Sequence, residues 1–154
     1  MEEALEDAKD ELKRVDHLIF VSLKYTRTVD VIKSVIERMI TFFDFAIDAL
    51  LKYAKGKKMI TEIPSNIGLR SSLVKKSFSD NAEILEGIEF YQTLRKLSKA
   101  KYTKREEYRR HVTMIAAIEN EGVVEVDIDL LCVYYEKTKK FISLMETMIF
   151  GKND

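Results

Sequence analysis

The segment from Thr28 to Tyr53 constrains the fold of this chain most strongly. It reads TVDVIKSVIERMITFFDFAIDALLKY, and most of its polar residues recur at steps of three or four positions. This spacing matches the period of an α-helix and gathers those residues on one stripe. The remaining helix surface is apolar and wider than one neighbouring helix would cover. We therefore expect a long helix that is either central in a bundle or shared across a subunit interface. The stripe consists of Lys33, Glu37, Thr41, Asp44, Asp48 and Lys52.

Two carboxylates of that stripe, Asp44 and Asp48, lie one helical turn apart among phenylalanines. Paired carboxylates are used in acid and base catalysis. However, both residues continue the polar stripe, and Asp48 stands four positions before Lys52, a spacing that forms ordinary ion pairs on helices. Lys33 and Glu37 have the same spacing. We therefore interpret the stripe as a solvated helix face and not as a catalytic site.

Helical periodicity also predicts three further helices. Apolar residues recur at helical spacing from about Glu3 to Lys24. Asp80 begins an N-terminal capping pattern for a helix that reaches about Lys99. Asp129 caps a last helix that ends at Gly151, where a left-handed residue is expected. Residues 59–78, before the helix that begins near Asp80, contain the only proline. We expect a long connection there, open to a short helical turn, that could act as a mobile flap.

The region from Thr103 to Ile128 is open to more than one interpretation. Thr103 followed by Glu106 fits a capping pattern, so residues 104–111 (KREEYRRH) would open a fourth helix. The runs HVTMIAAI and VVEVDI flank ENEG, and their β-branched residues favour a hairpin over residues 111–128 rather than a continuous helix. We predict a mainly α protein with one domain over residues 1–154. Its expected architecture is an up-down bundle of four to five helices with a small β-hairpin near residues 111–128.

Charge is balanced over the whole chain but distributed unevenly. Twenty-six basic and 26 acidic side chains give a formal net charge of zero. From Arg95 to His111, however, eight Lys and Arg side chains stand against two Glu, so one face is expected to be cationic. The apolar runs are much shorter than the roughly 20 residues needed to span a bilayer, and the acidic start lacks the basic region of a signal peptide. We therefore expect a cytoplasmic protein with no membrane association.

Several kinds of catalytic site lack their motifs. The sequence has no glycine-rich phosphate loop, no GxSxG and no HExxH, and neither histidine follows a Glu by three positions. The single cysteine, Cys132, lies in the apolar run LLCVYY and is interpreted as a small core residue. We expect no metal and no cofactor. A general base near neutral pH would be a histidine; His17 fits a hydrogen-bonded helix position, which leaves His111.

The string KREEYRRH places Arg105 six positions before His111. A small helical protein with a long second helix and an arginine followed after four to six residues by a histidine resembles the HEPN superfamily. The resemblance implies a dimeric bundle that is associated with RNA and, in active members, cuts RNA without metal. It gives Arg105 the role of contacting the scissile phosphate and His111 that of transferring a proton. A guanidinium fits phosphate oxygens, and an imidazole changes charge near pH 7.

Two hypotheses of different classes follow. The first is a homodimeric RNA-binding protein, or a metal-independent ribonuclease, with Arg105 and His111 as catalytic residues. Its RNA would be bound by the other cations of the basic segment, which are Lys99, Lys101, Lys104, Arg109 and Arg110. The second is a non-catalytic helical homodimer that binds a protein partner, as an antitoxin does. Two acids favour the second hypothesis. Glu106 lies next to Arg105, close to the proposed phosphate site, and Glu107 stands four positions before His111 and could form a surface pair with it.

Overall fold

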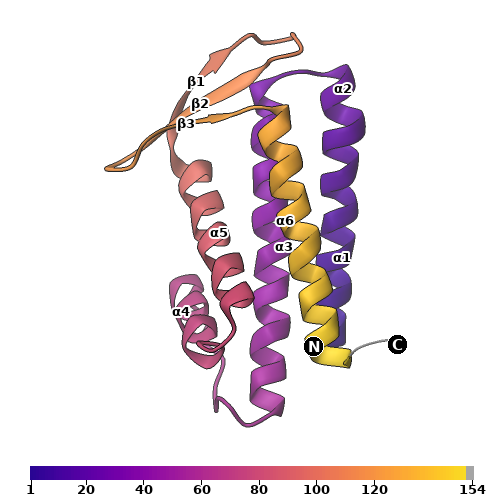
Figure 1. Ribbon diagram of the computed structural model, residues 1–154, viewed down its shortest axis with the longest axis vertical. Coiled ribbons are helices and arrows are strands. Elements are labelled where there is room, and N and C mark those ends of the chain that lie inside the picture. The colour runs from indigo at the N-terminus through magenta and orange to yellow at the C-terminus, as the bar shows by residue number, and fades with distance from the viewer. Residues whose placement is uncertain (152–154) are drawn as a thin grey trace.

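The computed structural model describes residues 1–151, in which long helices form a bundle and a small sheet lies at one end (Figure 1). The first helix runs without a break through α1 (Glu2–His17), a π-helical stretch η1 (Leu18–Ser22) and α2 (Leu23–Tyr25). It is followed by α3 (Val29–Gly56), α4 (Ile67–Ser77), α5 (Ala82–Lys99) and α6 (Ile128–Phe150). The predicted mainly α bundle is confirmed. None of the helices over residues 1–151 is long and apolar enough to cross a membrane.

The long helix α3 is the centre of the bundle. It packs against α1, α4, α5 and α6. Phe42 and Phe43 are fully buried, and the Phe43 ring lies 5.1 Å from that of Phe141 on α6 and 5.6 Å from that of Phe90 on α5. The wide apolar face of this helix is therefore covered within the chain. Of the two alternatives for it, the central position is observed, and no subunit interface is needed to explain that face.

The polar stripe of α3 is partly covered rather than solvated along its length. Asp48 forms the expected ion pair with Lys52 at 2.9 Å, and Arg70 of α4 also contacts it at 2.6 Å. Asp44 accepts a hydrogen bond of 2.6 Å from the Tyr91 hydroxyl of α5. Burial raises the pKa of Asp44, an effect that the Tyr91 hydrogen bond and two nearby arginines only partly offset. The interpretation of a solvated row was wrong for these two residues, because α4 and α5 pack over that part of α3.

The helix ends mostly agree with the expected signals. Thr28 caps α3 at the position where this helix was expected to begin. Gly151 follows the end of α6 with a φ of 81°, which is also as expected. Asn81 caps α5, one residue after the predicted Asp80. Asp127 caps α6, two residues before the predicted Asp129. The main difference is α4, an 11-residue helix inside the stretch predicted as a connection. Its apolar residues do not recur on one face, so periodicity did not predict a full helix there.

The sheet is antiparallel, with the strand order β1-β2-β3. Its strands are β1 (Lys101–Arg105), β2 (Thr113–Ile118) and β3 (Gly122–Val126). The hairpin predicted for residues 111–128 is confirmed as β2 and β3, whereas β1 was not predicted. Alternate residues of β2 and β3, including Met114, Ala116 and Val126, are buried against the bundle. The sheet lies at the end of the bundle opposite to the N-terminus (Figure 1).

Candidate nucleic-acid interface

The string KREEYRRH is the end of a strand and a loop, and the prediction that it opens a helix was wrong. Lys104 and Arg105 belong to β1, and Arg105 is paired in register with Thr113 of β2. Glu106 and Tyr108 have φ values of 53° and 66°, which lie in the left-handed region and break helical geometry. The capping pattern at Thr103 is local, and pairing with β2 overrides it.

This loop is fixed to the beginning of α3. The backbone N–H of Val29 donates to Oε2 of Glu107 at 3.0 Å, and the N–H of Tyr108 donates to the carbonyl of Arg27 at 2.7 Å. The first N–H groups of a helix have no partner within the helix, so a carboxylate there is stabilising. Glu107 therefore serves as a cap for α3 from 78 residues away. These bonds hold two loops, residues 26–28 and 106–112, against each other.

Two of the predicted site residues already have acidic partners. The guanidinium of Arg105 lies 2.7 Å from a carboxylate oxygen of Glu125 on β3, and this hydrogen bond raises the pKa of Arg105. Lys104 lies 3.5 Å from Glu107 and 3.9 Å from Asp30, and these charges raise its pKa as well. Lys104, Arg105, Asp30 and Glu125 are exposed, whereas Glu107 is half-buried. A phosphate could therefore compete for either cation.

His111 is exposed at the other end of the same loop. Its backbone carbonyl accepts a hydrogen bond of 2.8 Å from the hydroxyl of Thr113, and within residues 1–151 its imidazole forms no ion pair. The expected pair with Glu107 is absent there, because the loop is not helical and Glu107 contacts Val29 instead. Arg105 and His111 thus flank residues 106–110 at one end of the sheet. The loop brings a guanidinium and an imidazole to one region of the surface.

The other predicted RNA-binding cations form two groups. Arg109 and Arg110 are exposed in the loop, whereas Lys99 and Lys101 are exposed near the opposite end of β1. A five-residue strand spans about 13 Å from its first to its last residue. The basic segment is therefore not one patch but two groups of cations, and the group in the loop stands beside two acids, Glu106 and Glu107.

Sequence reasoning missed the residues that α2 and the following loop contribute to this surface. Tyr25 and Tyr108 have exposed fractions of 80% and 78%. The bond between Arg27 and Tyr108 places their loops together, and Lys24 is exposed beside them. The run KYTRT (24–28) mixes basic and aromatic residues, as KREEYRRH does. This shared composition was the only feature of the sequence that could have indicated a role for residues 24–28 in the surface. We call the combined region the loop surface; it consists of Lys24, Tyr25, Tyr108, Arg109, Arg110 and His111.

Comparisons of the chain with protein-family models, curated proteins and solved structures found no match. Among residues 1–151, no group of three or more His, Cys, Asp or Glu side chains is placed to hold a metal ion.

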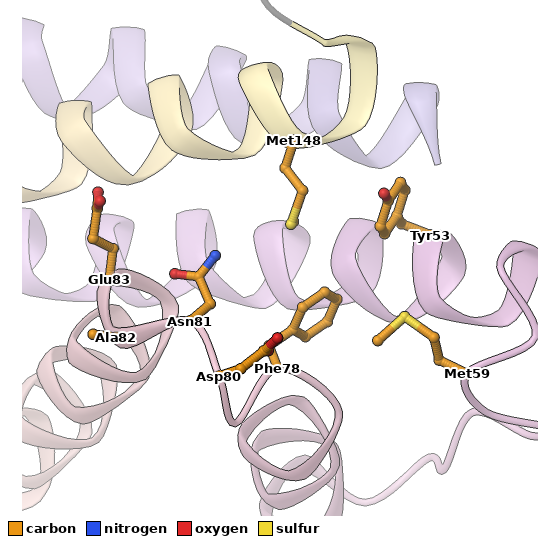
Figure 2. A pocket seen from close by; sticks show the side chains of 8 residues that line it. All are labelled: Tyr53, Met59, Phe78, Asp80, Asn81, Ala82, Glu83 and Met148. Carbon is orange, nitrogen blue, oxygen red and sulfur yellow. The ribbon is translucent and has the colours of Figure 1, made fainter.

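A pocket of about 530 Å³ lies at the opposite end of the bundle (Figure 2). Tyr53 and Phe78 stack along one side of it with ring centroids 6.5 Å apart, and Met148 of α6 points toward them. Two acids, Asp80 and Glu83, also line the pocket. Carboxylates repel phosphate, so this pocket is less suited to nucleic acid than the loop surface.

Proposed function

We propose that this chain is a helical protein that binds single-stranded RNA through the loop surface. One observation carries the proposal. The 2.7 Å bond from the Tyr108 N–H to the Arg27 carbonyl joins the loop that contains Tyr108 to the loop that follows Tyr25 at the end of α2. Both tyrosines are highly exposed and have basic neighbours in the sequence. An exposed aromatic ring is a large apolar surface that is left in water, and its combination with cations is typical of single-strand binding.

The chemistry of the loop surface suits an unpaired strand. Each base that stacks on an aromatic side chain contributes about 1–3 kcal/mol. Arg109, Arg110 and Lys24 can neutralise phosphates, with release of counterions. Bases within a duplex are stacked on one another, so their faces are not free for Tyr25 and Tyr108. The proposal therefore specifies single strands, and it keeps the RNA association that the resemblance to the HEPN superfamily implies.

Cleavage of that RNA is a second candidate function. It is supported by the exposure of Arg105 and His111 at the two ends of one loop. It is opposed by the ion pair of Arg105 with Glu125 and by the acid at position 106, because both compete with a phosphate for the guanidinium. We therefore place binding before cleavage. A non-catalytic module for a protein partner would use the same exposed tyrosines and arginines, and the RNA-binding measurements distinguish the two functions.

Binding can be measured by fluorescence anisotropy of a labelled single-stranded RNA. The double variant Arg109→Ala/Arg110→Ala should bind at least about tenfold more weakly, and the slope of log affinity against log salt should fall by about 1.4, because each phosphate contact to a single strand contributes about 0.7. Tyr25→Ala/Tyr108→Ala should weaken binding with little change in that slope, because stacking involves no counterions. Lys55→Ala/Lys57→Ala removes the same charge at the far end of α3 and should leave binding unchanged.

Two results would contradict the proposal. The first is the absence of RNA binding by the wild type at low salt. The second is equal affinity for the wild type and for both loop-surface variants, because the RNA would then contact another surface.

Cleavage needs a separate assay, in which RNA is incubated with the protein and a chelator. Our proposal predicts no cleavage that depends on His111. If cleavage occurs and is abolished in His111→Ala while RNA affinity is retained, the protein is a ribonuclease and His111 transfers the proton. In that case Glu125→Gln should raise the rate, because the amide releases the Arg105 guanidinium.

A further inference from the structure

A groove with a volume of about 1120 Å³ runs between α5 and α6. Its floor is made by apolar and aromatic residues, among them Phe90 on α5 and Tyr134 and Phe141 on α6. Gly87 allows the two helices to approach, because a Cβ at this position would lie 2.2 Å from the Phe141 ring. The groove is therefore an open furrow between two closely packed helices.

The two rims of the groove carry opposite charges. The α5 rim presents three exposed acids, Glu83, Glu86 and Glu89. The α6 rim presents Glu136 and Lys139, which pair with each other at 2.9 Å, and the exposed lysines Lys137 and Lys140. Among residues 1–151, the three acids of α5 and these two exposed lysines form no ion pair. Lys137 instead lies over the rings of Phe90 and Tyr134, at 5.3 and 5.9 Å from their centroids. Both rims therefore have charges free for an external partner.

The acids and the lysines lie at matching heights along the groove. Gly87 meets Phe141, so its neighbour Glu86 lies level with Lys140. The ring of Phe90 lies 5.0 Å from that of Tyr134 and beneath Lys137, so Glu89 lies level with Lys137. A two-fold axis that runs along the groove would place the α5 rim of one copy over the α6 rim of another at the same height. Glu86 and Glu89 would then each meet a lysine, and both contacts would occur twice.

We propose that the α5–α6 groove is a homodimer interface in which the acidic rim of each copy pairs with the basic rim of the other. A two-fold axis perpendicular to the length of the groove would instead place the acids of one copy on the acids of the other. The charge pattern therefore favours the axis that runs along the groove. This interface is independent of the loop surface, with which it shares no residue. It also does not rest on the apolar face of α3, which is covered within the chain.

The test is the mass in solution, measured by light scattering after gel filtration. The wild type should have twice the chain mass of 17.9 kDa. Glu86→Lys/Glu89→Lys makes both rims basic, and Lys137→Glu/Lys140→Glu makes both rims acidic, so each variant alone should be monomeric. An equimolar mixture of the two should form a heterodimer, because a basic rim then faces an acidic rim on both sides. Glu2→Lys/Glu3→Lys reverses two acids on α1 and should remain dimeric.

Circular dichroism of each variant shows whether it is folded. Recovery of the dimer in the mixture is itself a control, since a misfolded chain would not pair. A monomeric wild type at high micromolar concentration would overturn the proposal. So would two folded variants that remain homodimers, or two folded monomeric variants that fail to associate when mixed.

Discussion

At the scale of single residues, Glu107 has a structural role that the motif around it does not suggest. In the string KREEYRRH it could be taken for a charge beside an active site, yet its carboxylate accepts the backbone N–H of Val29. Its side chain connects the loop of the candidate site to the beginning of the central helix. A change at this residue is therefore expected to affect both stability and the loop surface.

Glu107→Ala should lower the free energy of unfolding by about 1 kcal/mol, the usual cost of losing a helix cap. Glu106→Ala is a matched control, because it removes the same charge from the neighbouring exposed position without removing the cap. Urea unfolding of both variants measures the difference. Equal stability of the two variants would mean that the bond to Val29 contributes nothing.

Asp44 predicts a dependence of stability on pH. Its pKa is raised by burial above its ordinary value of 3.8, so the folded protein holds this proton more tightly than the unfolded chain. The stabilisation from that proton is complete below pH 3.8 and is lost as the pH rises through the raised pKa. Asp44→Asn does not ionise and can still accept the Tyr91 hydrogen bond, so it should be more stable than the wild type at pH 7.

The measurement for Asp44 is urea unfolding of both proteins at pH 3.5 and pH 7. The advantage of the variant should shrink toward the lower pH, where the wild-type carboxyl also carries a proton. A variant that is less stable than the wild type at pH 7 would show that the nearby arginines outweigh the cost of burying the charge.

At the scale of elements, the packing of α5 on α6 depends on the missing side chain of Gly87. The Phe141 ring that would meet a Cβ here is itself buried and lies 5.1 Å from the ring of Phe43, so it cannot swing away freely. Overpacking of this kind costs about 1–3 kcal/mol, and the better helix propensity of alanine returns about 1 kcal/mol. Gly87→Ala should therefore be destabilising by up to about 2 kcal/mol.

Gly56→Ala is the control for Gly87→Ala. A Cβ at Gly56 meets nothing within 4 Å, so this change should be neutral or stabilising by up to about 1 kcal/mol. Thermal unfolding of both variants makes the comparison. A gain of stability in Gly87→Ala would mean that the two helices can separate without loss, and that they do not pack as described.

The elements also differ in how well the sequence predicted them. The α1–α2 stretch, α3, α5 and α6 follow from apolar residues at helical spacing, and the β2–β3 hairpin follows from its β-branched runs. The strand β1 could not be predicted in the same way. Its residues 101–105 alternate weakly, and they form a strand because β2 provides partners eight to sixteen residues away. Local capping signals at Thr103 carry no information about that pairing.

At the scale of the whole molecule, the candidate site is assembled from distant parts of the chain. The sequence singled out Arg105, His111, Arg109 and Arg110, because charge density is a local property. It could not place Tyr25 beside them, since the contact that joins the two loops spans 81 residues. It also could not show that Arg105 has Glu125 as a partner. A net charge of zero likewise conceals the cations of the loop surface at one end of the bundle and the opposed rims of the α5–α6 groove.

The most direct test of RNA binding at the loop surface is chemical-shift mapping by NMR. The isotope-labelled protein is titrated with a short single-stranded oligoribonucleotide at low salt, and the backbone amide signals are followed. We predict that the perturbed residues are concentrated at positions 24–27 and 105–111, and that α4 and the C-terminal end of α3 are unchanged. Perturbations centred on the α5–α6 groove or on the pocket near Tyr53, or no perturbation at saturating RNA, would contradict it.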